Sequence, residues 1–277
     1  MASAISVTLH QMRLTPAQQQ QFATRGYVVV DNVIPKSLVA DSVSAITTNL
    51  GVELDDPTSW YPGSKWTVPL YQHAAFWAVR EHPDVHDIFA QLLGGEQLWV
   101  SIDRASFKAP IRDEDEVKAM GNFIHFDMNP LEGEMLQGVV CLTDTSEEQG
   151  GFQCVPESLK DPERWMSRAD FDKENLAFTD LATLPIERPT AKAGDLVVFT
   201  SRLAHGNGAN RAGSPRIAQY VTMRPVGNEE ERQDRVNEFN ARLPPKWFRD
   251  KNSVPEPGPS PTLSELGRKL LGSQSWN

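Results

Sequence analysis

Residues 192–223 read KAGDLVVFTSRLAHGNGANRAGSPRIAQYVTM, and this stretch decides the fold. A tight turn at Gly194-Asp195 leads into the apolar run of residues 195–200, which predicts a buried strand. A loop rich in glycine and asparagine follows from His205, and residues 217–223 predict a second strand. Short strands separated by such turns are typical of a mainly β core.

The rest of the chain places helices before the strands. Thr15 is a predicted N-cap, Pro16 begins a helix, and Gly26 ends it. Two further helices are predicted near residues 36–49 and 83–93, and a short one near residues 263–271. The remaining predicted strands are residues 27–30, 98–102, 105–108, 137–142 and 151–155. This order predicts a β-sandwich or jelly roll with helices packed on one side.

One domain is expected over residues 1–277. Residues 14–95 form its helical buttress and residues 96–225 its β core. Residues 226–277 form a proline-rich extended segment followed by the last helix.

Composition excludes several classes of partner. The 277 residues carry 27 basic and 37 acidic side chains, a formal charge of −10. Nucleic acid and anionic membranes reward clustered Lys and Arg, so neither is expected as a partner. No apolar run approaches the roughly 20 residues of a membrane span, and no signal peptide is apparent. The two cysteines, Cys141 and Cys154, cannot form a disulfide framework, so we expect a reducing cytoplasm.

Six histidines limit any histidine-based metal site. His125 and Asp127 lie two residues apart, and a strand points such residues to one face. The same spacing recurs at His82 and Asp84, but Pro83 there opens a helix whose first turn suits acidic residues. We therefore interpret His82 as a helix cap and His86 as part of a solvated face.

His205 is the second candidate ligand, and Arg216 follows it by 11 residues. His10 and His73 have no carboxylate at strand spacing and are interpreted as structural or surface residues. Two histidines and one carboxylate on neighbouring strands make a facial triad, which binds Fe(II) and leaves open positions. A carboxylate cosubstrate needs a cation at its far end, and the planar fork of an arginine matches a carboxylate.

Taken together, these motifs resemble the phytanoyl-CoA dioxygenase family of Fe(II)/2-oxoglutarate oxygenases, a group that includes ectoine hydroxylase. The resemblance runs almost from end to end of the chain. Its motifs are residues 14–35, the Ser106-Phe107-Lys108-Ala109-Pro110 strand end, His125-x-Asp127, residues 143–158, and His205 with Arg216. It implies a cupin-like double-stranded β-helix in which His125, Asp127 and His205 hold the iron and Arg216 binds 2-oxoglutarate.

Further site residues follow from strand parity and from the resemblance. Lys108 resembles a 2-oxoglutarate contact, or is a surface lysine at a strand end. Gln137 is a candidate cofactor contact if its strand face points inward. Arg104 either meets an anionic substrate or pairs with an acidic neighbour. Three aromatic residues are interpreted either as lining a substrate pocket or as part of the core: Phe126, Phe152 and Trp66.

The expected activity is oxidation of a small organic molecule, most simply hydroxylation, with O₂ consumed and succinate and CO₂ formed. Two alternatives remain: a metal-binding or 2-oxoglutarate-binding protein without turnover, and a metal-dependent hydrolase or isomerase. Neither the substrate nor the oligomeric state can be inferred. Residues 111–121 are interpreted either as a flap over the site or as a solvated loop.

Overall fold

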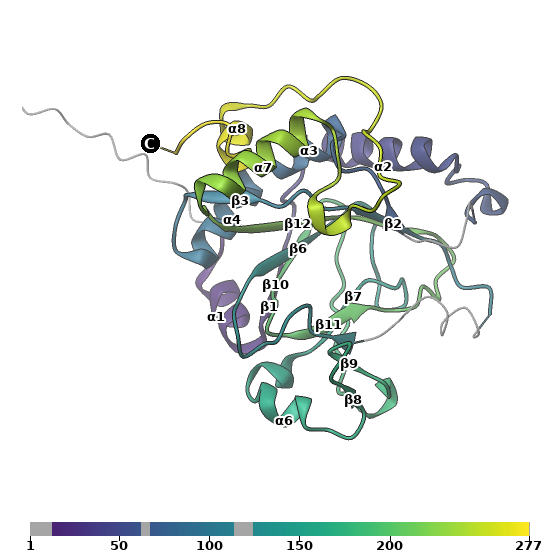
Figure 1. Ribbon diagram of the computed structural model, residues 1–277. Helices are drawn as coiled ribbons and strands as arrows, with labels where there is room; N and C mark the ends of the chain where they lie inside the picture. The colour runs from purple at the N-terminus through teal and green to yellow at the C-terminus, as the bar shows by residue number, and fades with distance from the viewer. Residues whose placement is uncertain (1–12, 62–66, 114–123, 277) are drawn as a thin grey trace, which may run out of the picture.

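Two antiparallel β-sheets form the centre of the computed structural model, which describes residues 13–61, 67–113 and 124–276 (Figure 1). The strands of the larger sheet are β1 (Tyr27–Val30), β2 (Thr67–Val68), β3 (Leu98–Val100), β4 (Ala105–Lys108), β6 (Leu136–Cys141), β10 (Leu196–Thr200) and β12 (Arg216–Pro225). Those of the smaller sheet are β5 (Ile124–His125), β7 (Phe152–Val155), β8 (Phe171–Asp172), β9 (Ala177–Phe178) and β11 (Ala204–Asn207).

The strand order shows how distant segments meet. The larger sheet runs β1-β10-β6-β12-β4-β2, with β3 also paired to β12, and the smaller runs β7-β11-β5-β9-β8. Most strands that follow each other in the sequence are therefore not paired with each other in the sheets. In the register, His205 lies opposite His125, and Arg216 lies opposite Lys108. This two-sheet arrangement confirms the predicted double-stranded β-helix.

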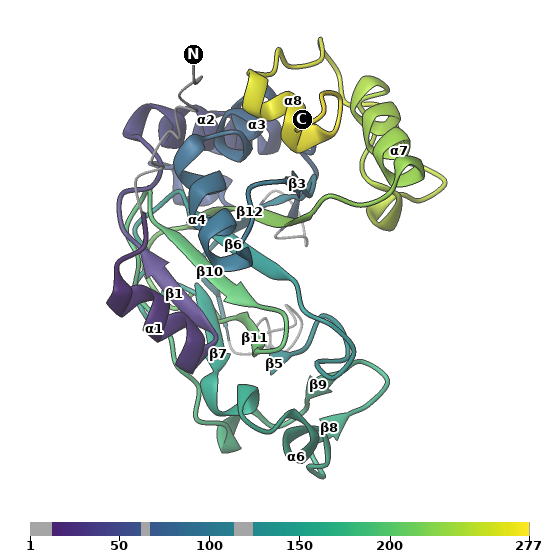
Figure 2. The ribbon, with the colours of Figure 1, turned by 90° about the vertical axis from the view of Figure 1, so that its left-hand side faces the viewer.

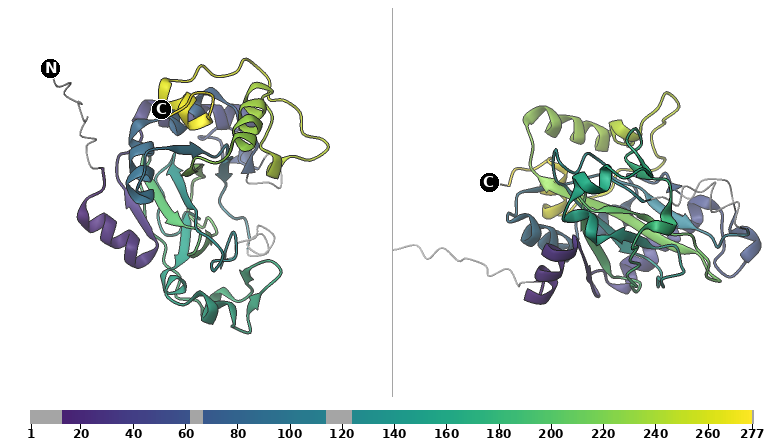
Figure 3. Two further views of the ribbon diagram at one scale, coloured as in Figure 1. Left: turned by 60° about the vertical axis from the view of Figure 1, so that its left-hand side comes forward. Right: turned by 90° about the horizontal axis from the view of Figure 1, so that it is seen from below.

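Helices cover the outer face of the larger sheet (Figures 1 and 2). The helices on this side are α1 (Pro16–Arg25), α2 (Lys36–Leu50), α3 (Ala74–Arg80), α4 (Pro83–Leu93), α7 (Glu229–Asn240) and α8 (Glu265–Leu271). The helix α6 (Pro162–Met166) lies instead beside β8 and β9 of the smaller sheet. Short 3-10 turns are η1 (Pro57–Ser59), η2 (Pro156–Leu159), η3 (Leu181–Thr183) and η4 (Lys246–Phe248). Figure 3 shows the segment after β12 on the side of the molecule that carries the N-terminal helices. Among the described residues, no helix is both long and apolar enough to cross a membrane.

Three groups of buried apolar side chains follow these layers. The largest joins the helices to the larger sheet and includes Ile46, Phe89 and Val221. The second lies between the sheets, where Phe199 of β10 meets Phe152 of β7 with ring centroids 4.7 Å apart. A third packs below the smaller sheet. The site described next opens beside the second group, between the two sheets.

Local sequence explains the helix ends. The Thr15 hydroxyl accepts a hydrogen bond from the Gln18 backbone N–H, and the Gln18 side-chain oxygen accepts one from the Thr15 backbone N–H, so α1 begins with a capping box. Gly26 then adopts a φ of 76°, a left-handed conformation that glycine tolerates without strain, and ends the helix.

The structure contains three helices that were not predicted, α3, α6 and α7, and it corrects one expectation. His86 is only 3% exposed, donates a hydrogen bond from Nε2 to the Glu96 carbonyl oxygen and stacks on Trp276, so it is a packed residue and not part of a solvated face. His82 does cap α4, because its Nδ1 accepts the backbone N–H of Asp84.

Candidate active site

Three side chains that the sequence singled out converge between the sheets. Within the described part of the chain, His125, Asp127 and His205 form the group suited to a metal, with one ligand atom from each lying within 4.8 Å of the others. The Nε2 atoms of His125 and His205 lie 3.1 and 3.3 Å from the two Asp127 carboxylate oxygens. The strand pairing of β5 with β11 sets this convergence, because it places the two histidines directly opposite each other.

Hydrogen bonds orient these side chains. His205 Nδ1 lies 2.8 Å from the Leu203 carbonyl oxygen. Because a carbonyl only accepts, Nδ1 donates this hydrogen bond, which turns Nε2 of the ring toward Asp127 as the candidate ligand atom. Gln137 Nε2 donates to Asp127 Oδ2 and steadies the carboxylate. Gln137 thus contacts a candidate ligand, whereas the sequence proposed it as a cofactor contact.

The charge state of Asp127 follows from these contacts. Burial alone would raise the pKa of its carboxyl, but hydrogen bonds from His125, His205 and Gln137 outweigh burial and lower the pKa below its ordinary value. Asp127 is therefore a carboxylate at neutral pH. The donor set is two imidazole nitrogens and one anionic oxygen, which is the set expected of a facial triad.

The other histidines within the described residues do not take part. His82 and His73 each cap a helix through Nδ1, and His86 is packed against Trp276. His10 lies outside the described residues, as do Trp66 and most of the 111–121 segment.

Two buried cations lie side by side at the β4–β12 pair. Arg216 is 0% exposed and Lys108 is 2% exposed. Arg216 Nη1 donates to Ser106 Oγ at 3.0 Å, but its Nε and Nη2 make no hydrogen bond within the described residues. A buried donor without a partner is costly, and a buried charge is more so, which points to an anionic ligand. Lys108 Nζ donates to the Gly208 carbonyl, close in sequence to His205.

Burial also sets the charge of Lys108. Desolvation, helped by the neighbouring Arg216, lowers the pKa of the Lys108 ammonium to about 7. The expectation of a surface lysine at this strand end is therefore wrong: Lys108 is buried beside a second cation.

A cavity of about 510 Å³ opens over the three converging residues. Its wall includes Gln137, Arg104 and Phe152 from the sequence-based set. Phe126 does not line it, because neighbouring strand residues point to opposite faces. Instead, Phe126 packs against Phe171 and Phe178 in the third apolar group. Lys108 and Arg216 are not part of the wall.

Sequence reasoning missed several wall residues. Tyr220, Thr222 and Arg224 line the cavity and share one face of β12 with Arg216. Because alternate residues of a strand point to the same face, the position of Arg216 predicts that Tyr220, Thr222 and Arg224 face the same way. The sequence therefore contained the information needed to find them. The same alternation also places the Arg216 side chain on the cavity side of the sheet. The wall also includes Trp247 and Phe248, which lie more than 20 residues beyond the last strand, where no local signal exists.

Comparison with known proteins agrees with this architecture. The model of the phytanoyl-CoA dioxygenase (PhyH) family matches residues 22–218. The chain belongs to the phytanoyl-CoA dioxygenase family. The match contains both histidines, Asp127, Lys108 and Arg216, and it ends before Trp247.

Individual relatives are distant. A Dictyostelium discoideum protein named for the same family is 24% identical over 282 residues, covering 79% of each chain. The GlcNAc Inducible Gene 2 protein of Candida albicans has a TM-score of 0.72 at 14% identity, covering 97% of this chain and 78% of that one. The epimerase SnoN, solved with Fe³⁺, α-ketoglutarate and nogalamycin RO, has a TM-score of 0.54 at 18% identity, covering 87% and 95%. At these identities the structural likeness shows a shared fold.

Proposed function

We propose that this member of the phytanoyl-CoA dioxygenase family is an Fe(II)- and 2-oxoglutarate-dependent oxygenase that acts on a small organic molecule. The observation that carries the proposal is the pairing of two features on facing sheets. One is the His125, Asp127 and His205 group, and the other is the buried Arg216, two of whose nitrogens make no hydrogen bond in the described chain.

The side chains at the site fit both an iron ion and 2-oxoglutarate. His125, Asp127 and His205 would hold the iron, since two imidazoles and a carboxylate suit Fe(II) and leave positions open for other ligands. Arg216 would pair with the far carboxylate of 2-oxoglutarate, with Lys108 as a second cation. A relative of the same fold, SnoN, was solved with iron and α-ketoglutarate, which supports this assignment.

Iron with bound 2-oxoglutarate supplies oxidation of a substrate by O₂, coupled to conversion of 2-oxoglutarate to succinate and CO₂. The protein's own part is geometric and electrostatic. Leu203 and Gln137 fix the orientation of two ligands, and the rings of Phe152 and Phe199 pack beside His205, with Phe199 at a centroid distance of 4.5 Å. These rings keep water from that side of the site.

Hydroxylation is the outcome that we propose for the substrate. Asp127 supplies the carboxylate of the triad, and the cavity is large enough for a small molecule beside it. The fold also supports other outcomes, since SnoN is an epimerase. We propose a cytoplasmic, single-domain enzyme.

Turnover of 2-oxoglutarate tests the proposal. The protein loaded with Fe(II) is expected to consume O₂ and form succinate only when 2-oxoglutarate is present, and faster when an extract contains its substrate. Binding of 2-oxoglutarate without succinate would instead indicate a sensor. Product formation under strict exclusion of O₂ would indicate a hydrolase or isomerase.

The affinity for 2-oxoglutarate is expected to depend on pH through Lys108. Without the ligand, the pKa of Lys108 is lowered to about 7, and a bound anion favours the charged form and raises it. Affinity is therefore steady below pH 7 and falls as the pH rises above it, by about tenfold between pH 6.5 and 8.5. The measurement is anaerobic titration of the Fe(II) protein at both values.

Lys108→Met is expected to remove this pH dependence and to bind 2-oxoglutarate as weakly at pH 6.5 as the native protein does at pH 8.5. Methionine fills the buried volume without a charge. The exposed Lys192 is the matched control, and Lys192→Met should keep the native profile. A native profile in Lys108→Met would assign the pH dependence to another group.

A further inference from the structure

The C-terminal strap, defined as residues 242–257, reaches the cavity although it lies outside the segment that the family model matches. Its 3-10 turn η4 supplies Trp247 and Phe248 to the wall. Trp247 is 62% exposed, an unusual state for the largest apolar side chain. An exposed indole at the edge of a cavity offers a flat apolar face to a bound ring.

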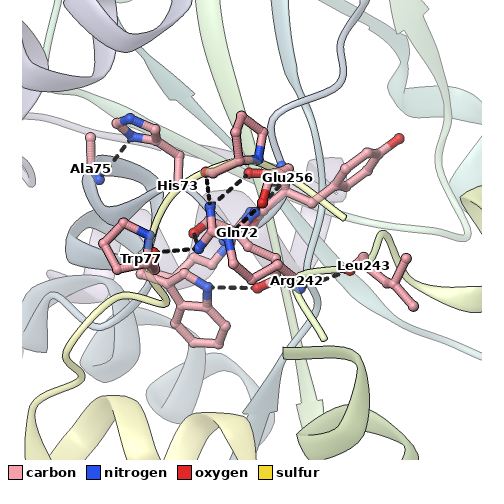
Figure 4. Close-up of polar contacts among 11 residues, drawn as sticks. Gln72, His73, Ala75, Trp77, Arg242, Leu243 and Glu256 are labelled. Carbon is pink, nitrogen blue, oxygen red and sulfur yellow. Dashed lines mark hydrogen bonds and ion pairs between the residues drawn. The ribbon is translucent and has the colours of Figure 1, made fainter. Parts of the chain in front are cut away.

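The strap is held in place by polar contacts with Gln72, in the segment that leads into α3 (Figure 4). The Glu256 carboxylate accepts the backbone N–H of Gln72 at 2.7 Å, and Gln72 Nε2 donates to the Leu243 carbonyl at 2.9 Å. Trp77 Nε1 donates to Gln72 Oε1 at 3.0 Å. Arg242 donates to backbone carbonyls within the strap and just beyond it, including Glu256 at 2.8 Å. The strap is therefore a pre-organised part of the wall and not a loose tail.

The turn that carries Trp247 has its own anchors. The backbone N–H of Lys246 and the guanidinium of Arg249 both donate to Glu238 Oε1, at 3.1 and 3.0 Å. The ring of Phe248 lies 5.7 Å from that of Tyr71. These contacts fix both neighbours of Trp247, so its indole is held at the cavity without being buried.

Arg104 lies beside this aromatic wall. Its guanidinium stands 4.0 Å above the Phe248 ring centroid. Its Nε makes no hydrogen bond within the described residues, and its acidic neighbour Asp103 is 4.0 Å away. The other arginine of the wall, Arg224, is closely paired with Glu231 at 3.2 Å. Arg104 is thus the more weakly paired of these two cations.

We propose that the substrate of this enzyme is a small carboxylate with a planar apolar ring, whose carboxylate pairs with Arg104 and whose ring packs on Trp247. The proposal rests on the proposed function, because it places the substrate in the same cavity. Phe248 already has Arg104 over its face, which leaves Trp247 for the ring. A carboxylate is favoured over a phosphate because Asp103 stands beside Arg104, and a second negative charge on the ligand would be repelled there.

Two probes that differ only in charge test this proposal: 2-naphthylacetate and its neutral amide, 2-naphthylacetamide. Each is titrated into the full-length protein loaded with Mn(II) and 2-oxoglutarate, and binding is measured by calorimetry. The native protein should prefer the acid by about tenfold or more. Arg104→Gln should remove that preference. Trp247→Ala should weaken both probes by about fivefold to tenfold, and Trp247→Phe by less.

Matched controls separate this proposal from the proposed function. Arg188→Gln and Leu131→Ala remove an exposed arginine and an exposed apolar side chain away from the cavity wall, and both should bind the probes as the native protein does. The affinity for 2-oxoglutarate is measured separately and should change less than twofold in Arg104→Gln and Trp247→Ala. Absence of acid binding, an equal affinity for the amide, or native affinities in both variants would overturn the substrate class while leaving the 2-oxoglutarate result intact. If the native protein itself does not bind 2-oxoglutarate, the proposed function is overturned instead.

Discussion

His205→Ala is expected to lose at least about a hundredfold in metal affinity and to show no measurable turnover of 2-oxoglutarate. Removing even an outer partner of a metal ligand typically costs 10- to 100-fold, and this change removes a ligand itself. His125→Ala and Asp127→Ala should behave alike, because each leaves two of the three converging donors. The measurement is calorimetric titration with Mn(II) under anaerobic conditions, together with succinate formation by the Fe(II) protein.

The control is His82→Ala. His82 caps α4 through a hydrogen bond to the Asp84 N–H at 3.3 Å, so its loss should lower stability by about 1 kcal/mol and leave metal affinity unchanged. Thermal unfolding of both variants separates the two effects. Native turnover in His205→Ala, or loss of metal in His82→Ala, would mean that the metal is held elsewhere.

The sequence predicted the elements whose signals are local. Gly26 and Gly94 end helices with φ values of 76° and 72°, and the apolar run of β10 is buried throughout. The candidate metal group was also partly predictable, because His125 and Asp127 lie two residues apart in an extended segment, although β5 itself ends at His125. That His205 lies opposite His125 required the register of β5 and β11, which sequence spacing alone does not give.

The helix α7 escaped prediction for a physical reason. Its buried residues are Arg235, Glu238 and Phe239, so its inward face is largely polar and lacks an apolar period. Arg235 is satisfied by backbone carbonyls, among them Leu271 at 3.1 Å. These hydrogen bonds depend on which carbonyl groups the fold brings close to Arg235, and a periodic pattern in the sequence does not reveal them.

Two aromatic residues show where prediction of the cavity wall from sequence failed: one was wrongly included and one was missed. Phe126 was expected in the pocket, yet the parity that joins His125 and Asp127 sends the residue between them to the far face. Trp247 was not considered, since its place in the wall depends on how the strap crosses the N-terminal helices. Local rules therefore predict the His125 and Asp127 part of the candidate metal group, whereas tertiary contacts decide which aromatic side chains line the cavity.

Arg216→Ala is expected to weaken 2-oxoglutarate binding by tens to thousands of fold. The guanidinium is fully buried, and two of its nitrogens make no hydrogen bond in the described chain. Truncating one partner of a buried charge pair costs roughly 2–5 kcal/mol, which gives this range of affinity. Arg216→Lys should recover only part of the loss, because an ammonium cannot reproduce the planar fork. The measurement is anaerobic titration followed through the metal-to-ligand charge-transfer band.

Arg211 is the control for the assignment of Arg216 as the 2-oxoglutarate-binding arginine. It lies five residues before Arg216, in the loop that precedes β12, and it is exposed, whereas Arg216 is buried in β12 opposite Lys108. Arg211→Ala should therefore bind 2-oxoglutarate as the native protein does. Metal affinity should change little in either variant, because no candidate ligand is altered. An unchanged dissociation constant in Arg216→Ala, or a larger effect from Arg211→Ala, would show that a different arginine binds the cosubstrate. A loss confined to Arg216 would identify the buried cation pair, rather than the net charge of the loop, as its binding site.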